Sequence, residues 1–106
     1  MKKKFNINGH VWVIEKRPEK ELLYEYKKRI NDEAYGCYGL TFYKEHKIWL
    51  AKELCKDEME RVLRHELTHC YIWETGLYHC DLNDEEIMCD IVASSYNFIK
   101  YVLEGK

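Results

Sequence analysis

The sequence predicts an α+β domain in which a small antiparallel sheet, including a hairpin, packs on about three helices. Three observations lead to this fold class. Short β-branched and aromatic runs come first in the chain, and long helical patterns come last. The chain has 106 residues, of which 46% are hydrophobic, so it can build one modest core. Because no linker, repeat or low-complexity tract divides it, we expect a single domain over residues 1–106.

The amino-terminal part of the chain predicts one strand and one helix. The run from Val11 to Glu15 is β-branched and aromatic and precedes the only proline, Pro18, so we expect a strand there. Apolar residues then recur at helical spacing from Glu19 to Ile30, which predicts a helix. We interpret the basic run from Lys2 to Lys4 as a solvated amino terminus.

A β-hairpin is predicted after a break at Gly36 and Gly39. The runs Leu40 to Tyr43 and Lys47 to Ala51 are short and extended, and a polar connection joins them. Two helices follow. The first spans about Glu58 to Glu74, because a capping box of Asp57 and Glu60 precedes the apolar pattern and Gly76 ends it. The second is capped by Asn83 or Asp84 and extends to about Leu103.

The first of these helices carries His65, Glu66 and His69, a His-Glu-x-x-His motif. Residues four apart on a helix share a face, so two imidazole nitrogens can bind one metal ion. Glu66 lies beside the first histidine, near enough to take a proton from a water that the metal activates. The simpler explanation is three solvated side chains on a surface helix. It fits less well, because most of the neighbouring residues are apolar, as in a central, buried helix: Val62, Leu63, Leu67, Cys70 and Trp73.

The second helix can supply a third metal ligand. Glu86 and Asp90 are four residues apart, so Glu86 can ligate the metal while Asp90 accepts the N–H of a ligating histidine. Glu86 could instead complete a capping box with Asn83. Three other residues stay open as the third ligand: Glu85, His79 and Asp81. A closed, structural zinc site would draw on one of three further residues: Cys70, Cys80 or His79.

These motifs resemble the gluzincin branch of the zincin metallopeptidases, and more closely the small ImmA/IrrE-like metallopeptidases of bacteria, prophages and mobile elements. The resemblance runs from Tyr38 to Ala93 and includes the hairpin, the His-Glu-x-x-His helix and the element with Glu86 and Asp90. It implies a minimal zincin-like fold with the motif on the central helix. It also implies a general base at Glu66, a Zn²⁺ ion, and a second layer of hydrogen bonds that includes Asp90. The implied zinc ligands are His65, His69 and Glu86.

The resemblance further implies a zinc metalloendopeptidase that hydrolyses a peptide bond in a regulatory protein such as a repressor, with a regulatory protein as a further partner. An edge strand of the hairpin would then pair with the extended substrate, although the hairpin could equally serve only to cover the core. The alternative is a non-catalytic module that keeps the zincin scaffold to bind metal or protein. Several residues could stabilise the oxyanion, so none is assigned: Tyr43, Tyr71, Tyr78, His46 and His79.

Composition indicates where such a protein would act. Lys and Arg number 17 against 19 Asp and Glu, so no basic field favours nucleic acid. No apolar run approaches the roughly 20 residues that span a bilayer, and the amino terminus lacks a signal-peptide pattern. The five cysteines form no C-x-x-C pair, which is typical of reduced, mostly buried thiols. We therefore expect a cytoplasmic protein that binds neither nucleic acid nor membrane.

Overall fold

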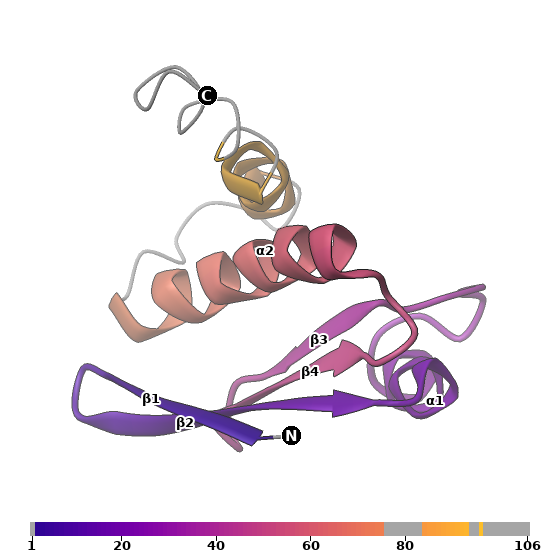
Figure 1. Ribbon diagram of the computed structural model, residues 1–106, viewed down its shortest axis with the longest axis horizontal. Helices are drawn as coiled ribbons and strands as arrows, with labels where there is room; N and C mark the ends of the chain where they lie inside the picture. The colour runs from indigo at the N-terminus through magenta and orange to yellow at the C-terminus, as the bar shows by residue number, and fades with distance from the viewer. Residues whose placement is uncertain (1, 76–83, 94–95, 97–106) are drawn as a thin grey trace.

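The computed structural model describes residues 2–75, 84–93 and 96. The elements in chain order are β1 (Lys2–Ile7), β2 (His10–Arg17), α1 (Glu19–Arg29), β3 (Gly39–Phe42), β4 (Lys47–Ala51) and α2 (Lys56–Thr75). A further helical segment covers 84–93. Figure 1 shows α2 lying over one face of the sheet, with segment 84–93 on the far side of α2. The predicted α+β class is confirmed.

The four strands form one sheet in the order β1-β2-β4-β3. β1 and β2 are antiparallel, and so are β3 and β4, but β2 and β4 run parallel. The prediction of an antiparallel sheet is therefore wrong at its central pairing, and the sheet is mixed. The reason is the connection between β2 and β4, which passes through α1 and β3 and so returns the chain in the same direction. The hairpin predicted from Leu40 to Ala51 is confirmed, and β3 forms one edge of the sheet.

The amino-terminal hairpin is an element that the sequence analysis missed. Lys2 to Lys4 belong to β1 and pair with β2, and their side chains are exposed, as expected of a solvated amino terminus. Asn8 and Gly9 join the strands with φ angles of 51° and 83°. Positive φ at both central residues defines the tight hairpin turn that Asn-Gly favours. The Asn-Gly pair was therefore the signal for this hairpin.

The helix boundaries depart slightly from prediction at α2. The helix begins at Lys56 rather than Glu58, and the residue that reaches back to its start is Glu58 rather than Glu60. The Glu58 carboxylate accepts a hydrogen bond of 3.2 Å from the backbone N–H of Cys55. The Asp57 and Glu60 capping box is thus not formed. Gly76 and the predicted stretch 97–103 of the last helix lie outside the described residues, while 84–93 and 96 are helical as expected.

The core lies on both faces of the sheet, because successive side chains of β4 point to opposite sides. Trp49 and Ala51 pack with Leu22 of α1 on one face. Ile48 and Leu50 pack with the α2 side on the other face, in a cluster that also includes Trp12, Ile14 and Cys70. Apolar side chains of α2 join this second cluster: Met59, Val62, Leu63, Leu67 and Trp73. The sheet thereby fixes which face of α2 is buried and leaves the opposite flank to meet segment 84–93.

The cysteines follow expectation wherever the structure describes them. Cys37, Cys70 and Cys89 are buried free thiols and Cys55 is exposed, while Cys80 lies outside the described residues. Within the described part of the chain, no helix has the length and apolar character needed to cross a bilayer.

Candidate metal centre

Segment 84–93 is held against α2 by Arg64, the residue before the first motif histidine. The Arg64 guanidinium donates to the backbone carbonyl of Ala93 from Nε at 3.2 Å and from Nη2 at 3.1 Å. The guanidinium also lies over the Tyr96 ring, 4.8 Å from its centroid. These contacts bring the carboxylates of the segment next to His65 and His69, which lie one turn apart on α2 with ring centroids separated by 4.9 Å.

One carboxylate, that of Glu86, lies between the two histidines. Its Oε1 is 3.1 Å from Nε2 of His65, and its Oε2 is 3.0 Å from Nε2 of His69. The Nε2 atoms of both histidines therefore point toward the same group. Glu86 is the residue that the sequence analysis favoured as the third ligand, and its side chain is 45% exposed, so solvent reaches this position.

The other ring nitrogen of each histidine contacts a second carboxylate. Nδ1 of His65 lies 3.0 Å from Oδ1 of Asp90, and Nδ1 of His69 lies 2.6 Å from Oε2 of Glu85. Asp90 thus has the position expected of the group that orients a ligating histidine. Glu85, one of the open alternatives for the third ligand, instead contacts the opposite side of His69. The remaining alternatives, His79 and Asp81, lie outside the described residues.

The number of imidazole N–H groups limits which hydrogen bonds the histidines and carboxylates of this cluster can form. A neutral imidazole has one N–H, and an ionised carboxylate only accepts. If Asp90 and Glu85 accept the Nδ1–H of each histidine, both Nε2 lone pairs face the oxygens of Glu86. Lone pairs that converge in this way require a proton or a cation between them. The donor set of two imidazoles and one carboxylate is therefore suited to a metal ion.

Glu66 is buried on the side of α2 that faces β3. Its side chain lies against the edge strand, and the residue is only 7% exposed. The Thr41 hydroxyl donates a 2.7 Å hydrogen bond to Oε1 of Glu66. Burial raises the pKa of Glu66 above its usual value, and the Thr41 hydrogen bond and the nearby His69 and His65 act against this rise. Both imidazoles therefore lie close enough to influence the motif glutamate.

The contact between β3 and this glutamate depends on Gly39. A methyl group at Gly39 would lie 2.6 Å from Cγ1 of Val62 and 2.9 Å from Cγ of Glu66. These separations are too short for any side chain at this position. The absence of a side chain at Gly39 therefore lets α2 approach the edge strand.

Cys89 is a residue of the site that the sequence analysis did not identify. Its thiol is fully buried, and its Sγ lies within 4.8 Å of ligand nitrogens of His65 and His69. Burial raises the pKa of Cys89 to about 12, and the carboxylates of Glu86 and Glu85 act in the same direction. The available signal was helical spacing, because Cys89 follows Glu86 by three residues and so lies on the same face. Cys70, which was considered for a closed site, is instead part of the core beneath α2.

Among the oxyanion candidates that the structure describes, Tyr43 is the one connected electrostatically with this cluster. Burial raises its pKa, and the carboxylates of Glu85 and Glu66 raise it further. Its ring also packs on Trp73, with centroids 5.8 Å apart. His46 lies elsewhere, in contact with His10, and Tyr71 is exposed on α2. Tyr78 and His79 lie outside the described residues.

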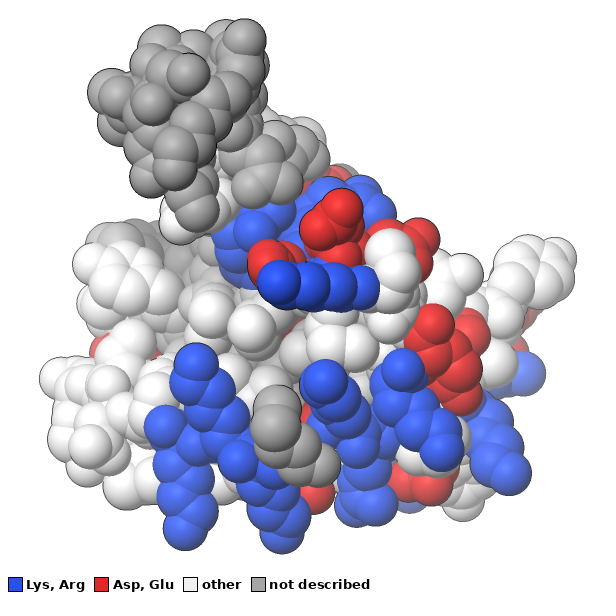
Figure 2. Space-filling model, viewed as in Figure 1, with Lys and Arg blue, Asp and Glu red and all other residues white. Residues whose placement is uncertain are grey.

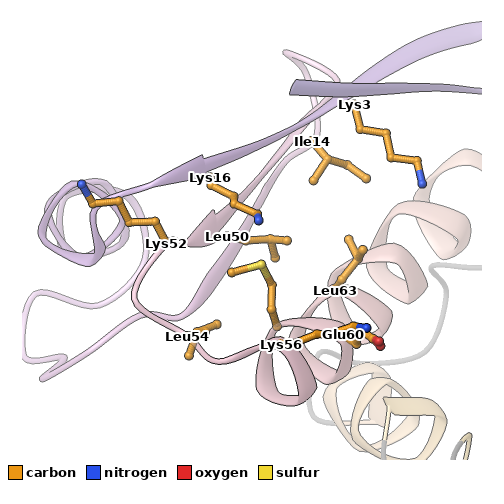
Figure 3. A pocket seen from close by; sticks show the side chains of 10 residues that line it. Lys3, Ile14, Lys16, Leu50, Lys52, Leu54, Lys56, Glu60 and Leu63 are labelled. Atoms are coloured by element: carbon orange, nitrogen blue, oxygen red, sulfur yellow. The ribbon is translucent and has the colours of Figure 1, made fainter. Parts of the chain in front are cut away.

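A separate hollow of about 370 Å³ opens on another flank of α2 (Figure 3). Its floor is apolar, with Ile14, Leu50 and Leu63, and its lining includes four lysines: Lys3, Lys16, Lys52 and Lys56. Lys and Arg side chains also gather over the sheet on the face seen in Figure 2. The lining includes none of the residues of the His-Glu-x-x-His motif. We therefore assign the chemistry of the motif to the cluster around Glu86 rather than to this hollow.

Among the described residues, two groups of side chains have ligand atoms close enough to share a metal ion. One consists of His65, His69 and Cys89, and the other of His10, His46 and Glu74. No protein-family model, no curated protein and no solved structure matches the chain.

Proposed function

We propose that this chain is a zinc-dependent metallopeptidase of the gluzincin type, similar to the small ImmA/IrrE-like enzymes. One observation carries the proposal: Nε2 of both His65 and His69 faces the single carboxylate of Glu86, at 3.1 and 3.0 Å. The Nδ1 atom of each histidine contacts another carboxylate, which is the usual way in which a ligating imidazole is oriented. This arrangement leaves three ligand groups directed at one point.

The donor set favours zinc. Two imidazoles and a carboxylate are typical ligands of a catalytic zinc ion, which keeps one coordination position open. We assign His65, His69 and Glu86 as these ligands. When bound, zinc would lower the pKa of a water molecule and polarise the carbonyl group of a substrate.

The protein's own residues would carry out the remaining steps. Asp90 and Glu85 would hold the Nδ1 protons of His65 and His69 and so keep each Nε2 free as a ligand. Glu66 would act as the general base. It would take a proton from water, and the hydrogen bond from the Thr41 hydroxyl to Oε1 would position its carboxylate. That proton would then pass to the leaving amine.

The edge strand β3 indicates the class of substrate. β3 pairs with β4 on one side, and no described strand pairs with its other side. Thr41 of β3 contacts Glu66 directly, so a peptide that added to this edge would lie beside the general base. We therefore propose an extended segment of a protein as the substrate. By resemblance, this would be a regulatory protein such as a repressor in the cytoplasm, where the cysteines would stay reduced.

The alternative, a non-catalytic metal-binding or interaction module, is favoured by one feature, the buried thiol of Cys89. With His65, His69 and Glu86, Cys89 would complete four ligands, as in a structural zinc site. In that case Glu66 would have no role as a base. Replacing Glu66 therefore separates the two functions.

The test uses the full chain and a proteome-derived peptide library read by mass spectrometry. We expect Glu66→Gln to keep its zinc and to lose peptide cleavage, and Glu60→Gln, an exposed glutamate on the same helix, to resemble wild type. Removal of zinc by a chelator should abolish wild-type cleavage, and added Zn²⁺ should restore it. Equal cleavage by Glu66→Gln and wild type, or cleavage in neither with zinc bound to both, would reject the peptidase proposal.

A further inference from the structure

A second cluster of metal-ligating side chains lies near the carboxyl end of α2. His10 begins β2, His46 lies in the turn between β3 and β4, and Glu74 is in the last turn of α2. The ligand atoms of these residues all lie within 4.8 Å of one another. Three segments that are distant in the sequence therefore meet at one point.

Glu74 is the buried member of this cluster. Its carboxylate is only 1% exposed, yet it contacts polar groups on two sides. Trp12 donates its indole N–H to Oε2 at 2.6 Å, and Nδ1 of His10 lies 2.9 Å from both carboxylate oxygens. Asn8 also donates from Nδ2 to the backbone carbonyl of Glu74 at 3.0 Å. The amino-terminal hairpin thus holds this carboxylate in place. The hydrogen bond from Trp12 is of the kind that orients a metal ligand from outside the coordination sphere.

His46 adds an independent observation. Its φ angle of 56° is in the left-handed region, where Asn, Asp and His are enriched among the residues other than glycine. The imidazole stacks on His10 with centroids 4.6 Å apart and lies 5.2 Å from Trp12. The contact between His10 and Glu74 does not need this ring. The stacked His46 ring therefore places a third ligand group beside the pair formed by His10 and Glu74.

We propose that His10, His46 and Glu74 form a second zinc site, separate from the candidate centre at His65 and His69. The ion would lie between Nδ1 of His10 and the Glu74 carboxylate, with the His46 ring as the third ligand. Two imidazoles and a carboxylate suit Zn²⁺. His10 is 47% exposed, so solvent provides both a path for the ion and a fourth ligand. Bound zinc would join the first hairpin, the β3 to β4 turn and the end of α2.

The two centres do not share ligands. Glu74 follows His69 by five residues on α2, which corresponds to about 7.5 Å along the helix axis and about 140° around it. The contacts of Glu74 are with residues of the first hairpin, whereas those of His69 are with segment 84–93. Each centre can therefore be removed by substitution without touching a ligand of the other.

The experiment titrates the metal-free full chain with zinc chloride and measures the heat of binding by isothermal titration calorimetry. Three variants are compared with wild type. One carries both His65→Ala and His69→Ala, one carries His46→Asn alone, and one carries all three substitutions. Asn suits the left-handed backbone at this position, so His46→Asn should keep the fold, and circular dichroism checks this. Glu45→Gln is the matched control, since it changes an exposed neighbour of His46.

We expect the double variant to bind one zinc ion per chain and to lose it when His46→Asn is added, while Glu45→Gln binds like its parent. Trp12→Phe, which removes the indole N–H, should weaken this zinc about tenfold. The inference is overturned if the double variant binds no zinc, or if adding His46→Asn leaves its binding unchanged. The inference stands and the proposed function fails if wild type and the double variant bind the same single zinc, which His46→Asn removes.

Discussion

Substituting Gly39 by alanine tests how closely the edge strand must approach the motif helix. The new methyl carbon would lie 2.6 Å from Cγ1 of Val62, 2.9 Å from Cγ of Glu66 and 3.0 Å from its Oε2. Carbon atoms pack at about 3.5–4.0 Å, so the methyl group requires a local separation of about 1 Å. Val62 and Glu66 both belong to α2, and moving one side chain does not relieve the other contact. The strand and the helix must therefore move apart.

The expected cost follows from this overlap. Overpacking a well-packed site lowers the free energy of unfolding by about 1–3 kcal/mol. In a domain of this size, a loss of this magnitude lowers the melting temperature by about 5–20 °C. A shift of about 1 Å at Glu66 should also lower the rate of peptide cleavage up to about a hundredfold. Thermal unfolding by circular dichroism and cleavage of the peptide library measure the two effects.

Gly36→Ala is the matched control. The nearest atom to a methyl group there is Oε2 of Glu19, at 3.0 Å, which is the end of a flexible side chain. We expect this variant to stay within about 0.5 kcal/mol of wild type. Combining Gly39→Ala with Val62→Ala should restore part of the stability that Gly39→Ala loses, because the closest contact disappears. If Gly39→Ala unfolds at the same temperature as Gly36→Ala, the close packing of β3 on α2 is refuted.

Three further changes have defined outcomes. Asp90→Asn should weaken zinc binding at the candidate centre about tenfold, measured by calorimetry, because His65 loses a charged acceptor. Cys89→Ala should keep both that zinc and peptide cleavage, since the proposed ligand set is complete without the thiol. Glu58→Gln removes a carboxylate whose pKa is held below its usual value by hydrogen bonds from Cys55. Its stabilising effect exists above the unfolded pKa and disappears as the pH falls through the folded pKa. The melting temperatures of wild type and variant should therefore differ at about pH 7 and converge in acid, once the pH lies below the folded pKa.

Each of these predictions has an outcome that contradicts it. Unchanged zinc affinity in Asp90→Asn would mean that this carboxylate does not orient His65. Loss of zinc in Cys89→Ala would make the thiol a ligand and favour the structural site. A difference between wild type and Glu58→Gln that persists unchanged in acid would show that the charge of Glu58 does not stabilise the start of α2.

The parts of the fold that sequence reasoning predicted correctly are those with a strong local period. The hairpin of β3 and β4 and the helix α2 follow from alternating and helical apolar patterns, and their bounds differ by two residues or fewer. Helical spacing also predicted that Asp90 would contact a motif histidine, and the structure places it beside His65. The amino-terminal hairpin had an equally local signal in Asn8 and Gly9, so its omission was an error of interpretation.

Other features depend on tertiary packing and have no local signal. The parallel pairing of β2 with β4 results from the path of the chain through α1, and strand patterns alone do not specify strand order. The contact of His10 with Glu74 joins residues 64 positions apart, so no spacing rule predicts it. Cys89 was on the correct helical face, but only its burial beside His65 shows that it belongs to the site.

The most direct test of the proposed metal centre is the zinc content of the purified full chain compared with that of Glu86→Gln, both carrying His46→Asn so that only the candidate centre is counted. We expect about one zinc ion per chain with Glu86 present, and weak or absent zinc in Glu86→Gln, because the amide is a poorer ligand between the two histidines. Full zinc retention in Glu86→Gln, or no zinc in the chain that keeps Glu86, would contradict the proposed metal centre.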